Sequence, residues 1–190
     1  MYLSRARLLT LAMISEGGAF LLATLLILLL KIDIQPLAGD LKADLLMGTI
    51  AALPPLALFV FSLSKYASQL PVIGPLRKTM LTDIRALFSR STVVDILLIS
   101  LCAGVAEELL FRGVLQVKLG IIMASVIFGL VHFVTPAYVI VATVMGLYMG
   151  VLFIEFDTLL VPIQTHFIYD LGALLYLKYA PEDTTSGEAA

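Results

Sequence analysis

The sequence predicts an all-α fold: a polytopic transmembrane helical bundle of about six spans, with one further amphipathic helix at the membrane interface. Of the 190 residues, 61% are hydrophobic and only 14% are charged, and the mean hydropathy is +1.05. Such a chain is too apolar to fold around one soluble core and still present a wet surface. The apolar residues also gather into runs of about 20, the length that crosses a bilayer as a helix.

These apolar runs define the expected spans and the domain organisation. Pro54 and Pro55 are expected to kink the second span, because proline removes a backbone hydrogen bond. We expect one integral membrane domain over 1–180, with a motif-bearing core at about 92–179, and a disordered polar tail at 181–190. The six runs lie at about 8–30, 45–63, 92–117, 119–135, 137–154 and 158–179.

The long connection at about 64–91 sets the expected orientation. It holds five basic residues and one acidic residue, Asp83, so the positive-inside rule places it in the cytoplasm. We therefore expect a multi-pass protein of the cell membrane with both termini cytoplasmic. The first run lacks a small-residue cleavage pattern after Leu30 and is expected to be retained. An apolar stripe within the connection predicts a helix lying on the membrane interface: Leu76, Met80, Leu81, Ile84, Leu87 and Phe88.

The third run contains three charged residues, in the segment Glu107-Glu108-Leu-Leu-Phe-Arg112. Each charged side chain at the centre of a membrane helix raises the free energy of insertion by roughly 2.5–3.5 kcal/mol. Such residues must therefore be paired with another charge, hydrated, or retained for a function. Glu108 and Arg112 are four residues apart on one helix face and are expected to pair. Glu107 points about 100° away and is left free for chemistry.

The chain has two histidines, and both lie in apolar spans. With a turn near 118–120, Glu107 and His132 each lie roughly 16–18 Å along their helices from that turn. His166 falls in the same buried layer, and Asp170 follows it by one helical turn, where it can orient the imidazole or face a developing oxyanion. The sequence therefore predicts one shared intramembrane site.

Three motifs on consecutive apolar runs resemble those of a known family. Glu107-Glu108-Leu-Leu-Phe-Arg112 fits EExxxR, Phe128-Gly-Leu-Val-His132 fits FxxxH, and His166-Phe-Ile-Tyr-Asp170 fits HxxxN/D. In this order they resemble the CPBP family, the glutamic intramembrane proteases related to CAAX-processing enzymes and also called Abi proteins. The resemblance covers about 100–175.

The resemblance implies a function and a role for each motif residue. Glu107 and His132 would activate a water, His166 and Asp170 would form the oxyanion site, and Glu108 and Arg112 would be a supporting ion pair. Phe128 is expected to contact substrate. Asp170 stands where relatives often carry Asn, so we expect it to hold a proton or to orient His166. The expected activity is metal-independent and cofactor-free endopeptidase cleavage of a membrane-associated protein or peptide.

Other functions remain open at this level. Glu107, His132, His166 and Asp170 are also acceptable zinc ligands, although the sequence has no HExxH motif. The cluster would also suit a non-catalytic immunity or peptide-binding protein, and a transporter is disfavoured because no inverted repeat is evident. The formal charge of -2 gives no basic surface for nucleic acid.

Three further residues are given structural roles from sequence. Cys102, the single cysteine, is interpreted as a packing residue, because no environment that would activate it is evident. Glu16 and Asp95 are expected to hydrogen-bond neighbouring helices, with nothing in the sequence that ties either to the site.

Overall fold

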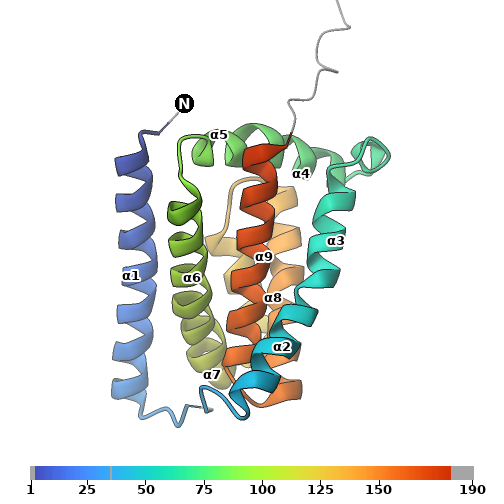
Figure 1. The fold of residues 1–190 in the computed structure, drawn as a ribbon. Coiled ribbons are helices and arrows are strands. Elements are labelled where there is room, and N and C mark those ends of the chain that lie inside the picture. The colour runs from blue at the N-terminus through green and yellow to red at the C-terminus, as the bar shows by residue number, and fades with distance from the viewer. Residues whose placement is uncertain (1–2, 35, 181–190) are drawn as a thin grey trace, which may run out of the picture.

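The computed structural model describes residues 3–34 and 36–180, and every regular element within them is a helix (Figure 1). This confirms the all-α class. The predicted disordered tail at 181–190 lies outside the described residues. In chain order the elements are α1 (Arg5–Leu30), α2 (Leu41–Ala51), α3 (Leu53–Ser62), η1 (Ala67–Gln69), α4 (Ile73–Thr79), η2 (Met80–Ile84), α5 (Arg85–Phe88), α6 (Val93–Leu110), η3 (Phe111–Gln116), α7 (Val117–Val131), α8 (Pro136–Phe156) and α9 (Leu160–Tyr179).

Four helical stretches among the described residues are long and apolar enough to cross a membrane, fewer than the six spans expected. They are Arg5–Leu30, Leu41–Ser62, Val93–Val131 and Pro136–Phe156. The third holds both the third and the fourth expected spans. It is interrupted at Gly120, whose φ of 81° is not helical and suits a residue without a Cβ. The expected sixth span corresponds to α9, which has 20 residues and is not among these four stretches.

Local sequence explains where several helices begin. Thr92 and Asp95 form a capping box at the start of α6, with each side chain bonded to the other residue's backbone N–H. Thr135 caps α8 ahead of Pro136, the first residue of that helix. The interruption expected from Pro54 is present, because α2 ends at Ala51 and α3 begins at Leu53.

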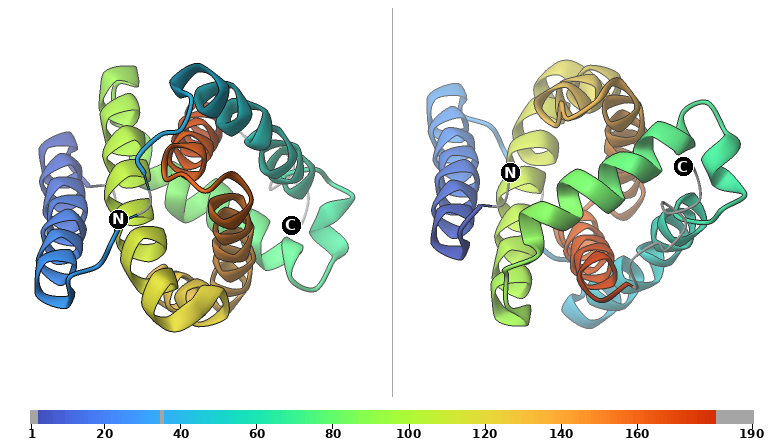
Figure 2. Two further views of the ribbon diagram at one scale, coloured as in Figure 1. Left: turned by 90° about the horizontal axis from the view of Figure 1, so that it is seen from below. Right: turned by 90° about the horizontal axis from the view of Figure 1, so that it is seen from above.

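Helix α9 lies in the middle of the bundle. It contacts α2, α3, α6 and α8, while α7 packs on α8 and α1 stands at one side against α6 (Figure 2). Glycines allow these helices to approach closely. A Cβ on Gly104 of α6 would lie 3.1 Å from the carbonyl oxygen of Ile163, and one on Gly48 of α2 would lie 2.8 Å from that of Val161.

Residues 73–88, which comprise α4, η2 and α5, run across one end of the bundle (Figures 1 and 2). We call this segment helix 73–88. Five residues of its predicted apolar stripe line a cavity inside the bundle rather than facing only lipid. Periodicity identified the apolar face but not what it covers, because lipid and a protein cavity both favour apolar side chains. These five residues are Leu76, Met80, Ile84, Leu87 and Phe88.

The two ends of the described chain lie on one side of the bundle. Helix α1 begins and α9 ends at the same end as helix 73–88 (Figure 1). At the opposite end, the segment before α2 is bonded to the turn between α8 and α9. There the amide of Leu159 donates to Pro36 at 3.2 Å, and that of Leu160 donates to Leu37 at 2.8 Å.

Candidate active site

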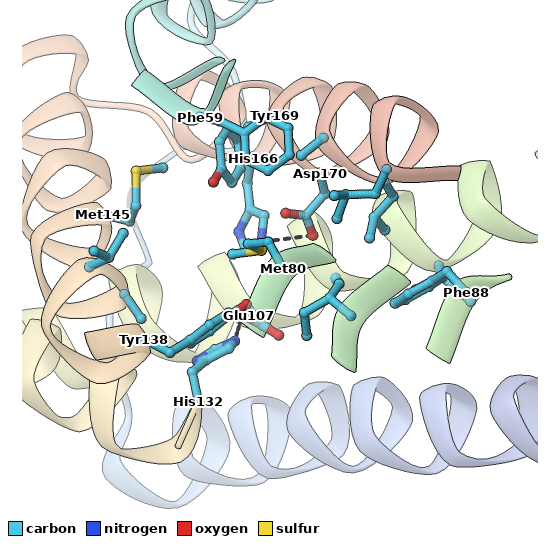
Figure 3. Close-up of a pocket in the computed structure, with 18 of the residues that line it drawn as sticks. Phe59, Met80, Phe88, Glu107, His132, Tyr138, Met145, His166, Tyr169 and Asp170 are labelled. Carbon is cyan, nitrogen blue, oxygen red and sulfur yellow. Dashed lines mark ion pairs between the residues drawn. The ribbon is translucent and has the colours of Figure 1, made fainter. Parts of the chain in front are cut away.

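Side chains from α6, α9 and the end of α7 meet in a cavity of about 300 Å³ beneath helix 73–88 (Figure 3). Glu107, His132, His166 and Asp170 all line this cavity. The residues that sequence analysis selected from three separate motifs are therefore brought to one place. Most of the remaining lining is apolar, including Tyr138 and Met145 from α8.

Glu107 and His132 face each other across α6 and α7. Oε2 of Glu107 lies 3.4 Å from Nε2 of His132, and this oxygen is buried with no hydrogen-bond partner among the described residues. Nδ1 of His132 lies 2.8 Å from the carbonyl oxygen of Phe128. Because a carbonyl only accepts, Nδ1 carries the proton and Nε2 is the nitrogen directed at Glu107. The pair is too far apart for a strong direct bond, and both of its members can bind a water.

Glu108 is fully buried and joins two other site residues. Its Oε2 accepts from Nε of Arg112 at 2.8 Å, as the four-residue spacing predicted. Its Oε1 lies 2.8 Å from Nδ1 of His166, a contact that sequence analysis missed. No local signal could have found it, since the two residues are 58 positions apart. Glu108 therefore fixes the imidazole of His166 as well as the guanidinium of Arg112.

His166 lies between two carboxylates. While Nδ1 points at Glu108, Nε2 lies 3.5 Å from Oδ2 of Asp170. The Asp170 side chain is 29% exposed, whereas that of His166 is 8% exposed. The face of His166 that carries Nε2 is thus the one available to a molecule in the cavity, and Asp170 is beside it.

Phe128 packs among the charged side chains. Its ring stacks on that of His132 with centroids 4.3 Å apart, and the guanidinium carbon of Arg112 lies 5.4 Å from its centroid. Phe128 also meets His166 edge to face. Phe128 lines the cavity, but it is only 6% exposed. The structure therefore shows it packed against His132, and its contact with substrate stays a prediction.

The helix changes its winding three residues after Glu108. Residues Phe111–Gln116 form the π-helical segment η3, which contains Arg112. Such bulges are rare and occur frequently at functional sites. The Nε of Arg112 donates to Glu108, and its guanidinium carbon lies over the ring of Phe128. Its two terminal nitrogens are buried without hydrogen-bond partners among the described residues.

The two acidic residues that sequence analysis left outside the site behave differently. Asp95 meets the expectation, because it pairs with Arg5 of α1, with Nε to Oδ2 at 2.6 Å. Glu16 does not, because it lines the cavity together with Glu107, His132, His166 and Asp170. Glu16 lies in α1, far from the motifs in sequence, so its spacing gave no indication of this position.

The four side chains considered as zinc ligands form two separate pairs, Glu107 with His132 and His166 with Asp170. Among residues 3–34 and 36–180, no group of three or more His, Cys, Asp or Glu side chains is placed to hold a metal ion. Cys102 lies apart from this cavity, in a groove between α1 and α6.

Comparison with known proteins finds a family that is similar to the segment carrying this site. Residues 89–172 match the family of Type II CAAX prenyl endopeptidases described as Rce1-like. This segment of the chain is therefore similar to Rce1-like endopeptidases over somewhat less than half of the sequence. The matched segment contains both glutamates, Arg112 and both histidines, but not α1 or helix 73–88.

A similar protein is YpbD of Bacillus subtilis (strain 168), whose name describes it as uncharacterized. The two sequences are 35% identical over 89 residues, which cover 45% of this chain and 47% of YpbD. The alignment thus spans about half of the relative. No solved structure matches the chain.

Proposed function

We propose that this protein is an intramembrane endopeptidase of the glutamic type, which hydrolyses a peptide bond in a membrane-associated protein or peptide. The observation that carries the proposal is the Glu107–His132 pair, whose facing atoms are 3.4 Å apart on the wall of a cavity that also contains His166. An unpaired carboxylate oxygen next to an imidazole nitrogen is suited to bind and deprotonate a water.

In the proposed reaction, the water oxygen attacks the carbonyl carbon of the scissile bond and one of its protons passes to Glu107. His132 holds the same water through Nε2. The tetrahedral intermediate then collapses with cleavage of the C–N bond, and Glu107 returns the proton to the leaving amine. The products are a carboxylic acid and an amine, and no covalent enzyme intermediate forms.

His166 is proposed to stabilise the negative oxygen of that intermediate. Nδ1 of His166 donates to Glu108, so Nε2 can donate to an oxyanion only when the ring carries a second proton. The two neighbouring carboxylates, Glu108 and Asp170, suit a positively charged ring. A donor fixed in a site with little water is worth more than the same donor in solution. Asp170 is proposed to orient the ring, which also explains why Asp is acceptable at this position.

The proposed topology has six passes with both termini in the cytoplasm. The turn at Gly120 supports division of Val93–Val131 into two passes, and α9, with its 20 residues, supplies the sixth. The basic residues of helix 73–88 lie at the end of the bundle where α1 begins and α9 ends. The positive-inside rule places that end in the cytoplasm.

The proposal is tested by incubating the purified protein in nanodiscs with a library of fluorogenic apolar peptides of about 20 residues, the length of a membrane span. Wild type, Glu107→Gln and His132→Ala are compared, each with and without a chelator. Cleavage by wild type that is lost in both variants and indifferent to chelator supports a glutamic protease.

Two other outcomes contradict the proposal. Cleavage that stops with chelator and returns with zinc identifies a metalloprotease. Peptide binding without cleavage, unchanged in Glu107→Gln, identifies a binding protein of the kind that an immunity function needs.

A further inference from the structure

Glu16 is a third glutamate of the catalytic cavity, in addition to the two of the EExxxR motif. It lies in α1, outside the segment that matches the protease family, and it lines the same cavity as Glu107 and His166. Its Oε2 is buried and has no hydrogen-bond partner among the described residues. A carboxylate in the middle of a membrane helix is costly and is usually retained for a function.

Helix α1 is held against α6 near both ends. Near its start, Arg5 pairs with Asp95 of α6. Toward its other end, Ala23 belongs to a buried cluster with Leu110 and Phe111, and Ala19 packs against that cluster. The buried residues of α1 are Leu8, near the first attachment, and Ala23, at the second.

A groove of about 330 Å³ lies between these attachments. Glu16 is the only charged residue among those that line it, and Glu16 also lines the catalytic cavity. It therefore stands where the groove and the cavity meet. The other lining residues are Met13, Gly17 and Phe20 of α1, and Leu101, Cys102, Val105 and Ala106 of α6.

We propose that Glu16 binds the substrate by accepting a hydrogen bond from a backbone N–H of an apolar segment that enters the cavity through this groove. The inference rests on the proposed protease function and names how its substrate is held. A peptide must leave the helical conformation near the scissile bond to be cleaved. Each N–H released in an apolar surrounding then needs an acceptor, and the free oxygen of Glu16 is the one that the groove offers.

The first test compares Glu16→Leu, which removes the acceptor, with Glu16→Gln, which keeps a carbonyl oxygen. A lost hydrogen bond to a charged group corresponds to a roughly 10- to 100-fold lower kcat/KM for Glu16→Leu, expressed mainly in KM. Glu16→Gln is expected to retain most of the activity. Thr24→Val is the control, since it removes a polar group from the same helix at an exposed position.

A second arm identifies the substrate group. The amides around the cleavage site of the best peptide are replaced one at a time by esters, which removes one N–H each. At one position the ester is expected to lower kcat/KM for wild type and to cause no further loss in Glu16→Leu. If the ester and Glu16→Leu lower kcat/KM additively at every position, the proposal is overturned. Equal losses of kcat/KM in Glu16→Gln and Glu16→Leu would also overturn it, because they would point to a role of Glu16 in charge or proton transfer.

Binding of the same peptides in nanodiscs, followed by fluorescence anisotropy, separates this inference from the protease proposal. Weaker binding to Glu16→Leu than to wild type and Thr24→Val supports the role of Glu16 even if no peptide is cleaved. Equal peptide binding by Glu16→Leu and wild type overturns the role of Glu16 but does not contradict the proposed protease function. Thermal unfolding checks for a structural cause, because Glu16→Leu makes α1 more apolar and is not expected to destabilise the fold.

Discussion

At the scale of single residues, Glu107 and Glu108 are adjacent in sequence but differ in burial and in hydrogen-bond partners. Glu108 is fully buried and bonded to both Arg112 and His166. Glu107 has one oxygen without a hydrogen-bond partner among the described residues and faces the cavity. The 100° rotation between neighbouring helical positions is sufficient to place the two carboxylates in these different surroundings.

Replacing each glutamate by glutamine is expected to separate these roles. Glu108→Gln should lower the free energy of unfolding by about 3–5 kcal/mol, because it leaves the buried charge of Arg112 without its partner. Glu107→Gln should change it by less than about 1 kcal/mol, because it breaks no ion pair with an arginine. Reversible unfolding in mixed detergent measures both. A loss for Glu107→Gln as large as that for Glu108→Gln would contradict these assignments.

At the scale of elements, the position of His132 depends on how closely α7 approaches α8. A Cβ on Gly129 would lie 2.8 Å from the carbonyl oxygen of Val139 and would also meet Thr143. Gly129 follows Phe128, whose ring stacks on His132. The glycine therefore fixes the site indirectly, through the packing of these two helices.

Gly129→Ala is expected to destabilise the protein by about 1–3 kcal/mol, the usual effect of overpacking, and to lower cleavage by displacing His132. Gly18→Ala is the matched control, because nothing lies within 4 Å of a Cβ at that helical position. The control should be neutral or stabilising by up to about 1 kcal/mol. Unfolding and peptide cleavage are measured for both, and equal behaviour of the two variants would contradict the role of Gly129.

The attachment of α1 to α6 allows another comparison of single substitutions. Arg5 has a side chain that is 54% exposed, whereas that of Asp95 is 4% exposed. An exposed arginine in an ion pair contributes little to stability, because solvent screens its charge. Asp95→Ala should cost more than Arg5→Ala, because it also removes the hydrogen bond that the Asp95 carboxylate accepts from the backbone N–H of Thr92. Thermal unfolding of the two variants tests the order, and a larger loss for Arg5→Ala would contradict it.

At the scale of the whole molecule, the bundle encloses a polar site under a basic helix. Helix 73–88 contributes apolar side chains to the cavity and carries Arg77, Lys78 and Arg85. In the proposed topology, the same segment closes the site and lies at the cytoplasmic face. The catalytic cavity would then lie toward the cytoplasmic half of the bilayer.

This orientation predicts the behaviour of reporter fusions. A fluorescent protein fused at either terminus should fluoresce, and alkaline phosphatase inserted near Lys42, at the opposite end, should be active. The basic residues explain the difference, because they are retained on the cytoplasmic side. Active phosphatase at either terminus would contradict the proposed topology.

Sequence reasoning identified the helices and four motif residues that line one cavity, but not all of their contacts. Hydrophobic runs and the spacing of Glu108 and Arg112 are local properties, so the all-α class and that ion pair could be predicted. The bond between Glu108 and His166, the cavity-facing stripe of helix 73–88 and the position of Glu16 depend on tertiary packing. No periodicity within one helix encodes which neighbour it will meet.

The most direct test of the central proposal is the initial rate of cleavage of one apolar peptide by wild type, Glu107→Gln and Glu155→Gln. Glu155 is exposed near the end of α8 and is absent from the cavity lining, so its substitution controls for the loss of a carboxylate. The proposed mechanism predicts a rate lower by about 10²–10⁴-fold for Glu107→Gln, the contribution of a general base, and an unchanged rate for Glu155→Gln. Cleavage by Glu107→Gln at the wild-type rate would contradict it.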